Sequence, residues 1–217
     1  MTKKLVIAGA GDFGREVAAL VKRINSRGEG QAFALLGFVD DNDHLQGCLI
    51  DGIPVLGKVD WINSYQDELW VVCSIGTGSV RKKIIGKITN PKVKFPSLVD
   101  PDVIFLGDAY LGEGSIICAA SVISVNVKVG RHSIVNLACT LGHDVSIGEY
   151  CTINPGSNLS GFVETGECVD IGTGTKIIQH IKIGKNSTIG AGTVVIRDIE
   201  ENVTAVGNPA RVVKYKG

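Results

Sequence analysis

Aliphatic residues recur at every sixth position through the second half of the chain. An α-helix repeats its apolar positions with a period near 3.6 and an isolated strand with a period of 2, so a six-residue period fits neither. With the single exception of Thr165, this register is aliphatic at Leu111, Ile117, Ile123, Val129, Val135, Leu141, Ile147, Ile153, Leu159, Ile171, Ile177, Ile183, Ile189 and Val195. The pattern predicts a parallel β-helix, a solenoid in which each repeat contributes one short strand and one turn.

A second inward position lies four residues after each aliphatic one, and its size varies along the chain. It is mostly small, at Ser115, Ser121, Ser133, Cys139, Cys151, Ser157, Thr175, Ser187 and Thr193. Every third one is larger, at Val127, Val145, Val163, Ile181 and Ile199, a spacing of 18 residues. Three repeats therefore make one coil with one unlike side, which predicts a triangular prism. A β-sandwich of short strands would show no such recurrence.

Glycine often follows the aliphatic residue, at Gly112, Gly130, Gly142, Gly148, Gly166, Gly172, Gly184 and Gly190. Glycine suits turns that need a positive φ and places where two backbones approach closely. Either requirement is expected at the corners of such a prism.

The first part of the chain alternates buried apolar runs with helical spacing. Strands are expected over Lys3–Ala8, Phe33–Val39 and residues 69–74, and a helix over residues 15–24. A further helix carries Val80, Ile84, Ile85 and Ile88. This alternation predicts a small, Rossmann-like parallel α/β sheet. Because Pro91, Pro96 and Pro101 punctuate the chain, we predict two domains, residues 1–95 and 96–217.

A G-x-G-x-x-G motif, Gly9 to Gly14, lies between the first predicted strand and the first predicted helix. Backbone N–H groups and a helix N-terminus there could hold a phosphate, and Asp40 or Asp41 could accept hydrogen bonds from a ribose or a base. A dinucleotide dehydrogenase is one interpretation, and a simple tight βα turn is another. A domain of about 90 residues has room for only one mononucleotide-sized unit, which favours a single nucleotide or a nucleotide-sugar.

Composition limits the classes of partner that this chain is expected to bind. The chain has 217 residues with 22 basic and 22 acidic side chains and no basic stripe, so nucleic acid is not an expected partner. We expect no signal peptide and no membrane span, and hence a cytoplasmic location. The six cysteines include no C-x-x-C pair, and Cys139 and Cys151 are expected to be free buried thiols.

The strongest catalytic candidate is His143, in the run Leu141-Gly142-His143-Asp144. The residues 18 positions away, Val125 and Gly161, show that the repeat itself does not require an imidazole here. Beside Asp144, which would fix the tautomer and raise its basicity, His143 could act as a general base; the alternative is a solvated surface pair.

The other histidines carry weaker expectations. His132 is expected in a solvated turn, His180 near a cleft and His44 in a polar loop. Because the histidine, aspartate and glutamate residues lack metal-ligand spacing, we expect no metal site.

The whole chain resembles the bacterial sugar acetyltransferases of the bacillosamine, perosamine and sialic-acid O-acetyltransferase type. The resemblance rests on the hexapeptide prism, the Gly-rich α/β domain, the Gly142-His143-Asp144 run and the ending Gly207-Asn208-Pro209-Ala210-Arg211. It implies a left-handed β-helix, a homotrimer, acetyl-CoA bound between neighbouring prisms, and a UDP-sugar or related nucleotide-sugar held by the front domain. The activity implied is acetyl transfer to a sugar amino group for bacterial surface glycan synthesis.

The resemblance also implies roles for individual residues. His143 matches the catalytic base and Asp144 its acidic neighbour. The implied substrate-binding residues are Gly11, Asp12, Phe13, Asp40, Asp41 and Gly76. The implied acetyl-CoA-binding residues are Thr152, Gly161, Thr173 and Ala191.

Two departures from the family bear on the identity of the sugar. Thr152 stands where bacillosamine-type members have a second histidine near the thioester. Asp12 stands in the Gly-rich loop where small or basic residues are common in the family, and it would repel a nearby phosphate. The alternatives kept open are a sialic-acid or polysaccharide O-acetyltransferase, a non-catalytic nucleotide-sugar-binding assembly protein, and a metalloenzyme whose histidines meet between subunits.

Overall fold

The computed structural model describes residues 2–28 and 33–216. Its first part is a six-stranded sheet in the order β3-β4-β2-β1-β5-β6, in which only β3 and β4 pair in antiparallel fashion. The elements are β1 (Lys3–Ala8), α1 (Asp12–Ser26), β2 (Phe33–Val39), the 3-10 helix η1 (Asp43–Leu45), β3 (Leu49–Ile50), β4 (Ile53–Gly57), α2 (Asp60–Ser64), β5 (Leu69–Cys73), α3 (Gly78–Gly86) and β6 (Val93–Lys94).

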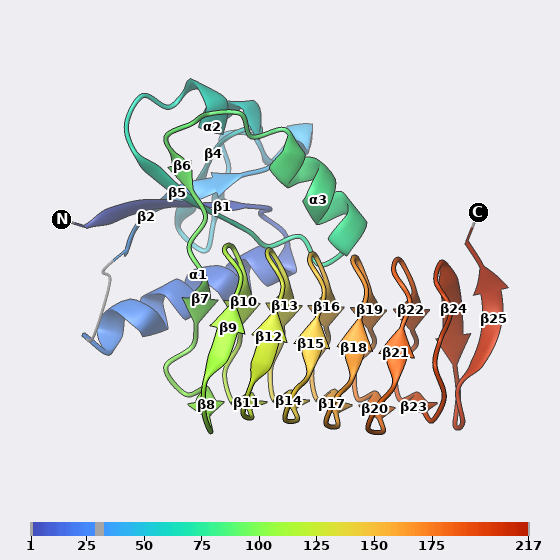
Figure 1. The fold of residues 1–217 in the computed structure, drawn as a ribbon. Helices are drawn as coiled ribbons and strands as arrows, with labels where there is room; N and C mark the ends of the chain where they lie inside the picture. The colour runs from blue at the N-terminus through green and yellow to red at the C-terminus, as the bar shows by residue number, and fades with distance from the viewer. Residues whose placement is uncertain (1, 29–32, 217) are drawn as a thin grey trace.

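Alternating residues of β1 explain why helices cover both faces of this sheet. Leu5 and Ile7 pack with α1, whereas Val6 and Ala8 pack with the α2 and α3 side. Figure 1 shows the sheet between α1 below and α2 and α3 above. The Rossmann-like expectation is therefore confirmed, and the strands over Lys3–Ala8 and Phe33–Val39 have the predicted bounds.

The second part is a left-handed parallel β-helix whose coils stack along one axis (Figure 1). The first sheet holds β7 (Leu98–Val99), β10 (Ile116–Ile117), β13 (Ile134–Val135), β16 (Thr152–Ile153), β19 (Asp170–Ile171), β22 (Thr188–Ile189), β24 (Val203–Val206) and β25 (Arg211–Tyr215). The second holds β8 (Ile104–Phe105), β11 (Val122–Ile123), β14 (Thr140–Leu141), β17 (Asn158–Leu159), β20 (Lys176–Ile177) and β23 (Val194–Val195). The third holds β9 (Ala109–Leu111), β12 (Val127–Val129), β15 (Ser146–Ile147), β18 (Glu164–Thr165) and β21 (Lys182–Ile183).

The 18-residue recurrence is the height of one coil. Ile116 pairs with Ile134, and Val122 pairs with Thr140, each one coil apart in the same sheet. The larger inward residues all belong to the third side, where Val127, Val145 and Val163 are buried. Thr165 is buried too, and its hydroxyl accepts the Gly148 N–H at 3.0 Å. Both features confirm the predicted prism.

The corners use glycine differently from position to position. A Cβ on Gly130 would lie 2.5 Å from the backbone of Gly148 in the next coil, so glycine here permits close approach of backbones. The left-handed conformation occurs two residues further on, and often at side chains such as His132 (φ 53°), Asp144 (φ 60°) and Phe162 (φ 59°). Asp and His adopt this region more readily than Phe does. Because Phe162 adopts it too, the repeat does not determine which side chain stands at these corner positions.

The front sheet is seated on the outer face of the first sheet of the prism. The outward-facing column there begins with Leu98, Ile116 and Ile134, all buried and packed in one cluster with Leu5 and Leu20. Burying three large aliphatic residues stabilises this junction by about 2 kcal/mol for each side chain. Apolar residues at outward positions of the prism therefore indicate the surface against which the front domain packs.

One expectation about the junction was wrong. His132 is not solvated but 2% exposed, with its ring stacked on Tyr150 and edge-on to Phe95. Its Nδ1 atom has no hydrogen-bond partner in the described part of the chain. Burial lowers the pKa of His132 to about 4, so the imidazole is neutral. The sequence places His132 in a turn correctly, but the front domain covers that turn.

The boundary at residues 95 and 96 stays a prediction, although β6 and β7 lie on either side of it.

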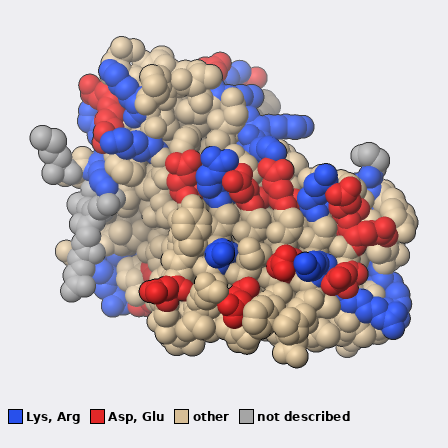
Figure 2. Space-filling model, viewed as in Figure 1, with Lys and Arg blue, Asp and Glu red and all other residues tan. Residues whose placement is uncertain are grey.

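Figure 2 shows acidic and basic side chains interspersed on the visible face, without a large region of one sign. No helix within residues 2–28 and 33–216 is long and apolar enough to cross a membrane. In the same residues, no group of three or more His, Cys, Asp or Glu side chains could hold a metal ion. The expected buried thiols, Cys139 and Cys151, are buried and free.

Candidate active site

His143 lies on the corner between the second and third sheets, which we call the base corner (residues 125–126, 143–144, 161–162 and 179–180). Its side chain is 53% exposed, and Nδ1 lies 3.0 Å from Oδ2 of Asp144. The other carboxylate oxygen of Asp144 accepts the Asn126 side-chain amide at 2.6 Å. The Asn126 amide and, after it, His143 lower the pKa of Asp144. An ionised carboxylate at Nδ1 favours the tautomer that leaves Nε2 free to accept a proton.

Gly161 makes room for the imidazole. A Cβ on Gly161 would lie 2.5 Å from both Nε2 and Cε1 of His143, closer than any real contact. The ring is also edge-on to Phe162, with centroids 5.1 Å apart, and Phe162 stacks on His180 at 4.8 Å. The base corner thus carries an aromatic row beside an open imidazole.

Sequence reasoning missed Asn126 and Phe162 at this corner. Both stand 18 residues from Asp144, so they occupy the same corner column in the neighbouring coils. Reading the repeat by columns across coils, rather than along the chain, would have found them.

The six residues expected to bind substrate meet at one edge of the front sheet. Gly11, Asp12 and Phe13 follow β1, Asp40 and Asp41 follow β2, and Gly76 follows β5. These three strands are neighbours and parallel, so their carboxyl ends share an edge. Crevices at this edge are where open α/β sheets bind ligands.

The glycines of the front loop have separate roles. A Cβ on Gly9 would lie 2.7 Å from Oγ of Ser74, and one on Gly14 would collide with the Gly9 carbonyl. A Cβ on Gly11 would meet nothing within 4 Å. Gly9 and Gly14 therefore build the tight turn, whereas Gly11 borders open space.

The acidic side chains at this edge also serve the fold. Asp40 accepts the Ala10 N–H at 2.9 Å, and Asp41 accepts the Val59 N–H at 3.0 Å and the Lys87 ammonium at 2.7 Å. Lys87, followed by the Val59 N–H, lowers the pKa of Asp41. Asp12, in contrast, points into solvent in the first turn of α1. These contacts hold the loops of the edge but leave the substrate roles as predictions.

The four residues expected to bind acetyl-CoA are not together in one chain. Gly161 is on the base corner, whereas Thr173 and Ala191 are exposed on the corner between the first and second sheets. Thr152 is buried under the front domain, where its hydroxyl donates to the Gly76 carbonyl at 2.6 Å. The structure therefore brings His143, Asp144 and Gly161 together and separates them from Thr152.

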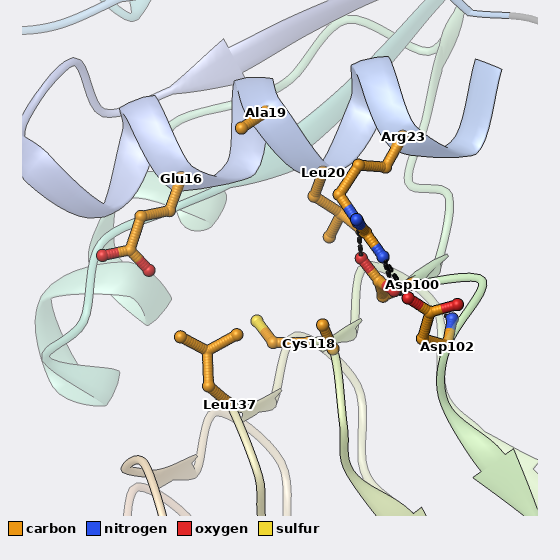
Figure 3. Close-up of a pocket in the computed structure, with 9 residues that line it drawn as sticks. Glu16, Ala19, Leu20, Arg23, Asp100, Asp102, Cys118 and Leu137 are labelled. Atoms are coloured by element: carbon orange, nitrogen blue, oxygen red, sulfur yellow. Dashed lines mark hydrogen bonds and ion pairs between the residues drawn. The ribbon is translucent and has the colours of Figure 1, made fainter. Parts of the chain in front are cut away.

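A cavity of about 390 Å³ lies between α1 and the prism. Figure 3 shows Glu16, Leu20 and Arg23 on one side of it, and Cys118 and Leu137 on the other. Arg23 closes one end through hydrogen bonds of 2.7 and 3.0 Å to Asp100 and 2.6 Å to Asp102. Burial raises the pKa of Cys118 to about 12, so this thiol lines the cavity as a neutral group.

Comparison with known proteins agrees with this architecture. Residues 4–88 match the family described as PglD N-terminal domain. A search of curated proteins finds no match. Among solved structures, the acetyltransferase domain of PglB from Neisseria gonorrhoeae FA1090 in complex with acetyl coenzyme A is 31% identical, with a TM-score of 0.87 over 98% of this chain and 100% of that one.

Two further structures cover nearly the whole chain. WeeI from Acinetobacter baumannii AYE is 30% identical, with a TM-score of 0.87 over 98% of this chain and 100% of that one. PerB from Caulobacter crescentus, in complex with CoA and GDP-perosamine, is 26% identical, with a TM-score of 0.83 over 99% of each chain. Together with the exposed His143 and the Gly-rich front edge, these matches show that the chain belongs to the hexapeptide-repeat sugar acetyltransferases and is an acyltransferase.

Proposed function

We propose that this protein transfers the acetyl group of acetyl-CoA to an amino group of a nucleotide-activated amino sugar, UDP-linked or similar, for bacterial surface glycan synthesis. The observation that carries the proposal is the exposed His143 imidazole, whose Nδ1 atom contacts Asp144 and whose Nε2 atom is left to accept a proton. It lies on a β-helix of the kind found in this family. The PglB domain binds acetyl coenzyme A, and PerB binds CoA and GDP-perosamine. No enzyme nucleophile is required, because an amine can attack a thioester directly.

The reaction proceeds in two proton-balanced steps. The sugar amine attacks the thioester carbonyl of acetyl-CoA and forms a tetrahedral intermediate. Nε2 of His143 takes the proton from the new ammonium nitrogen, and Asp144 stabilises the resulting imidazolium. The C–S bond then breaks, and the CoA sulfur leaves and receives the proton. A backbone N–H beside His143, such as that of Gly161, would stabilise the oxyanion.

The front edge, where we place the substrate, and the base of one chain lie on opposite sides of the prism. The front domain covers the first sheet through Leu98, Ile116 and Ile134, and the base corner is the corner opposite that sheet. A sugar held by the front domain therefore meets His143 of a neighbouring copy. The homotrimer belongs to the proposal for this reason.

The distribution of exposed apolar residues supports the same assembly. On the second sheet and its two corners, the exposed large hydrophobic residues are Ile104, Phe105, Leu106, Val125, Leu137, Phe162, Ile178 and Ile196. Thr173 and Ala191 border this sheet at one edge, and Gly161 borders it at the other. Packing of neighbouring prisms would bring Gly161 of one copy close to Thr173 and Ala191 of the next, whereas Thr152 stays under the front domain.

The test is free-thiol release from acetyl-CoA with a panel of acceptors. The panel contains a UDP-linked 4-amino sugar, GDP-perosamine, and a UDP-N-acetyl sugar without a free amine as control. Release with an amino sugar, with the N-acetylated product identified by mass spectrometry, is the expected result. Sialic acid and a polysaccharide are added as hydroxyl acceptors, and release with these alone would replace the proposal with O-acetylation.

The shared site has its own test. A Gly11→Phe variant is expected to block the front edge, because a Cβ on Gly11 meets nothing within 4 Å and the ring would extend from there. Gly11→Phe and His143→Ala chains are expected to be inactive alone. Co-assembled in equal amounts as trimers, they are expected to recover about a quarter of the wild-type activity, because a quarter of the sites pair an intact front domain with an intact base. No recovery in mixed trimers would place the whole site within one chain.

A further inference from the structure

Arg81 on α3 is a fully buried cation, and within residues 2–28 and 33–216 it forms no ion pair with a carboxylate. Its side chain is 0% exposed. Six neutral oxygens lie within hydrogen-bond distance of its five N–H groups: the carbonyls of His132, Ile75, Gly76, Tyr150 and Cys151, and the hydroxyl of Thr152. Burial lowers the pKa of Arg81, yet an arginine in a protein stays charged. A side chain in this state needs a reason beyond packing, because burying a charge costs several kcal/mol.

The six acceptors belong to two different parts of the molecule. The Ile75 and Gly76 carbonyls are in the loop after β5, at the front edge where the substrate-binding residues meet. The others are in the prism, where Nε donates to His132 at 2.6 Å and Nη2 donates to Tyr150 and Cys151 at 2.9 Å. One planar group thus joins the front loop to two successive coils.

Two neighbouring contacts tighten the same joint. The Thr152 hydroxyl accepts from Arg81 at 3.1 Å and donates to the Gly76 carbonyl, so Gly76 is held from two directions. A Cβ on Gly78 would collide with the Tyr150 carbonyl, so glycine lets the first turn of α3 rest on the prism backbone.

Apolar packing already fastens the two parts through Leu98, Ile116 and Ile134. What an aliphatic contact does not supply is direction, whereas a guanidinium fork fixes several oxygens at defined angles. We propose that Arg81 is a positioning residue that fixes the loop of Ile75 and Gly76 against the prism, so that the nucleotide-sugar is presented in one place to the acetyl-transfer site. This inference rests on the proposed function for its substrate.

The chain offers a matched control in the next residue. Lys82 lies on the same helix and pairs with Glu167 of the prism at 2.5 Å, and both side chains are exposed. Within residues 2–28 and 33–216, neither side chain forms a hydrogen bond or an ion pair with Ile75 or Gly76. Lys82→Gln removes a contact across the same junction without disturbing the front edge. An exposed pair of this kind contributes little to stability.

The experiment compares Arg81→Lys, Thr152→Val and Lys82→Gln in two readouts that do not depend on turnover. Hydrogen exchange of the loop amides measures whether the loop is held. Calorimetric titration with UDP, GDP and CoA measures each site separately. Arg81→Lys keeps the charge but loses the fork, so we expect faster exchange in the loop and about 10-fold weaker binding of the nucleotide that wild type prefers. CoA binding is expected to stay within about 2-fold.

Steady-state kinetics then separates positioning from stability. In Arg81→Lys the KM of the amino-sugar acceptor is expected to rise about 10-fold while the KM of acetyl-CoA is unchanged. Thr152→Val should show the same split, more weakly, which guards against a misfolded Arg81 variant. Unchanged loop exchange and nucleotide binding in a folded Arg81→Lys protein would overturn the inference. So would a fall in kcat with unchanged KM values, in proportion to the fraction of the protein that is folded.

A rise in the KM of acetyl-CoA for Thr152→Val would also overturn it, and would return Thr152 to the acetyl-CoA site. The fate of the proposed function is read separately. If wild type acetylates no amino sugar, that function fails, and exchange and nucleotide binding still decide the role of Arg81.

Discussion

The first sheet of the prism and the base corner are built from the same 18-residue repeat, yet one is interior and the other is open. On the first sheet, the outward column begins with Leu98, Ile116 and Ile134 and is covered by the front domain. On the base corner, the left-handed column reads Asn126, Asp144, Phe162 and His180 and stays accessible. The repeat determines the frame, and the residues at its outward positions determine which surface is covered and which can react.

The largest expected effect tests the open side. His143→Ala is expected to lower acetyl transfer to an amine about 100- to 10,000-fold, and a hydroxyl acceptor would suffer more because an alcohol is a weaker nucleophile. Thiol release from acetyl-CoA measures the loss, and unchanged thermal unfolding would show that the corner carries no part of the fold. Full activity of this variant on its true acceptor would remove His143 from the mechanism.

The matching change on the covered side should affect stability instead. Ile116→Ala removes a fully buried side chain at the junction and is expected to cost about 2–5 kcal/mol, more than Val125→Ala, which truncates a base-corner side chain that is 46% exposed in one chain. Urea unfolding of the two variants measures the difference. Equal costs would mean that the two columns do not differ as described.

Acid should weaken the covered side through His132. Its pKa is about 4 in the folded chain and near 6.5 when exposed, so the unfolded chain takes up the proton first as the pH falls. The stability from the neutral imidazole is complete above about pH 6.5 and is lost as the pH falls to about 4, an effect of about 3 kcal/mol.

Urea unfolding as a function of pH tests this, with His132→Asn as the comparison because Asn tolerates the left-handed backbone there. The variant should lose part of the slope between pH 6.5 and 4. Arg131 and Arg81 also disfavour the imidazolium and Glu149 favours it. Parallel slopes in the two proteins would show that His132 is not the group that titrates.

A smaller effect is expected from Gly161→Ala. The added methyl would meet His143 at 2.5 Å and displace the imidazole, with an expected loss of about 10-fold in kcat and little change in thermal unfolding. Gly11→Ala, whose Cβ meets nothing, is the matched substitution for the fold. If Gly161→Ala is fully active, the imidazole does not work from its present position.

The smallest effect is expected from Asn126→Ala. Asn126 acts only through Asp144, so its loss should reduce kcat about 3-fold. It should also shift the pH dependence of the rate. Asn126→Asp would place a second carboxylate against Asp144 and should be the more damaging of the two. Equal, wild-type rates in both variants would show that the amide is only a surface contact.

The sequence predicts features that repeat or that act through apolar patterning. The prism, its unlike third side and the strands of the front sheet follow from periodicity, and His143 stands out because its column does not require it. Contacts between distant segments leave no such signal. Apolar spacing predicts the helix that carries Val80 but not the burial of Arg81, because most acceptors of the guanidinium come from residues 132 and 150–152.

The repeat fixes the axial position of every corner residue in steps of one coil. Each coil adds one strand spacing, about 4.8 Å, to the distance along the prism axis between His143 and Leu98, the first residue of the first sheet that packs against the front domain. Gain or loss of 18 residues between the two would move the base along the prism axis by the height of one coil and keep it on the same corner. A change of six residues would instead rotate it to another face. Acceptors of different reach could therefore be matched by counting whole coils, without redesign of the base or its neighbours.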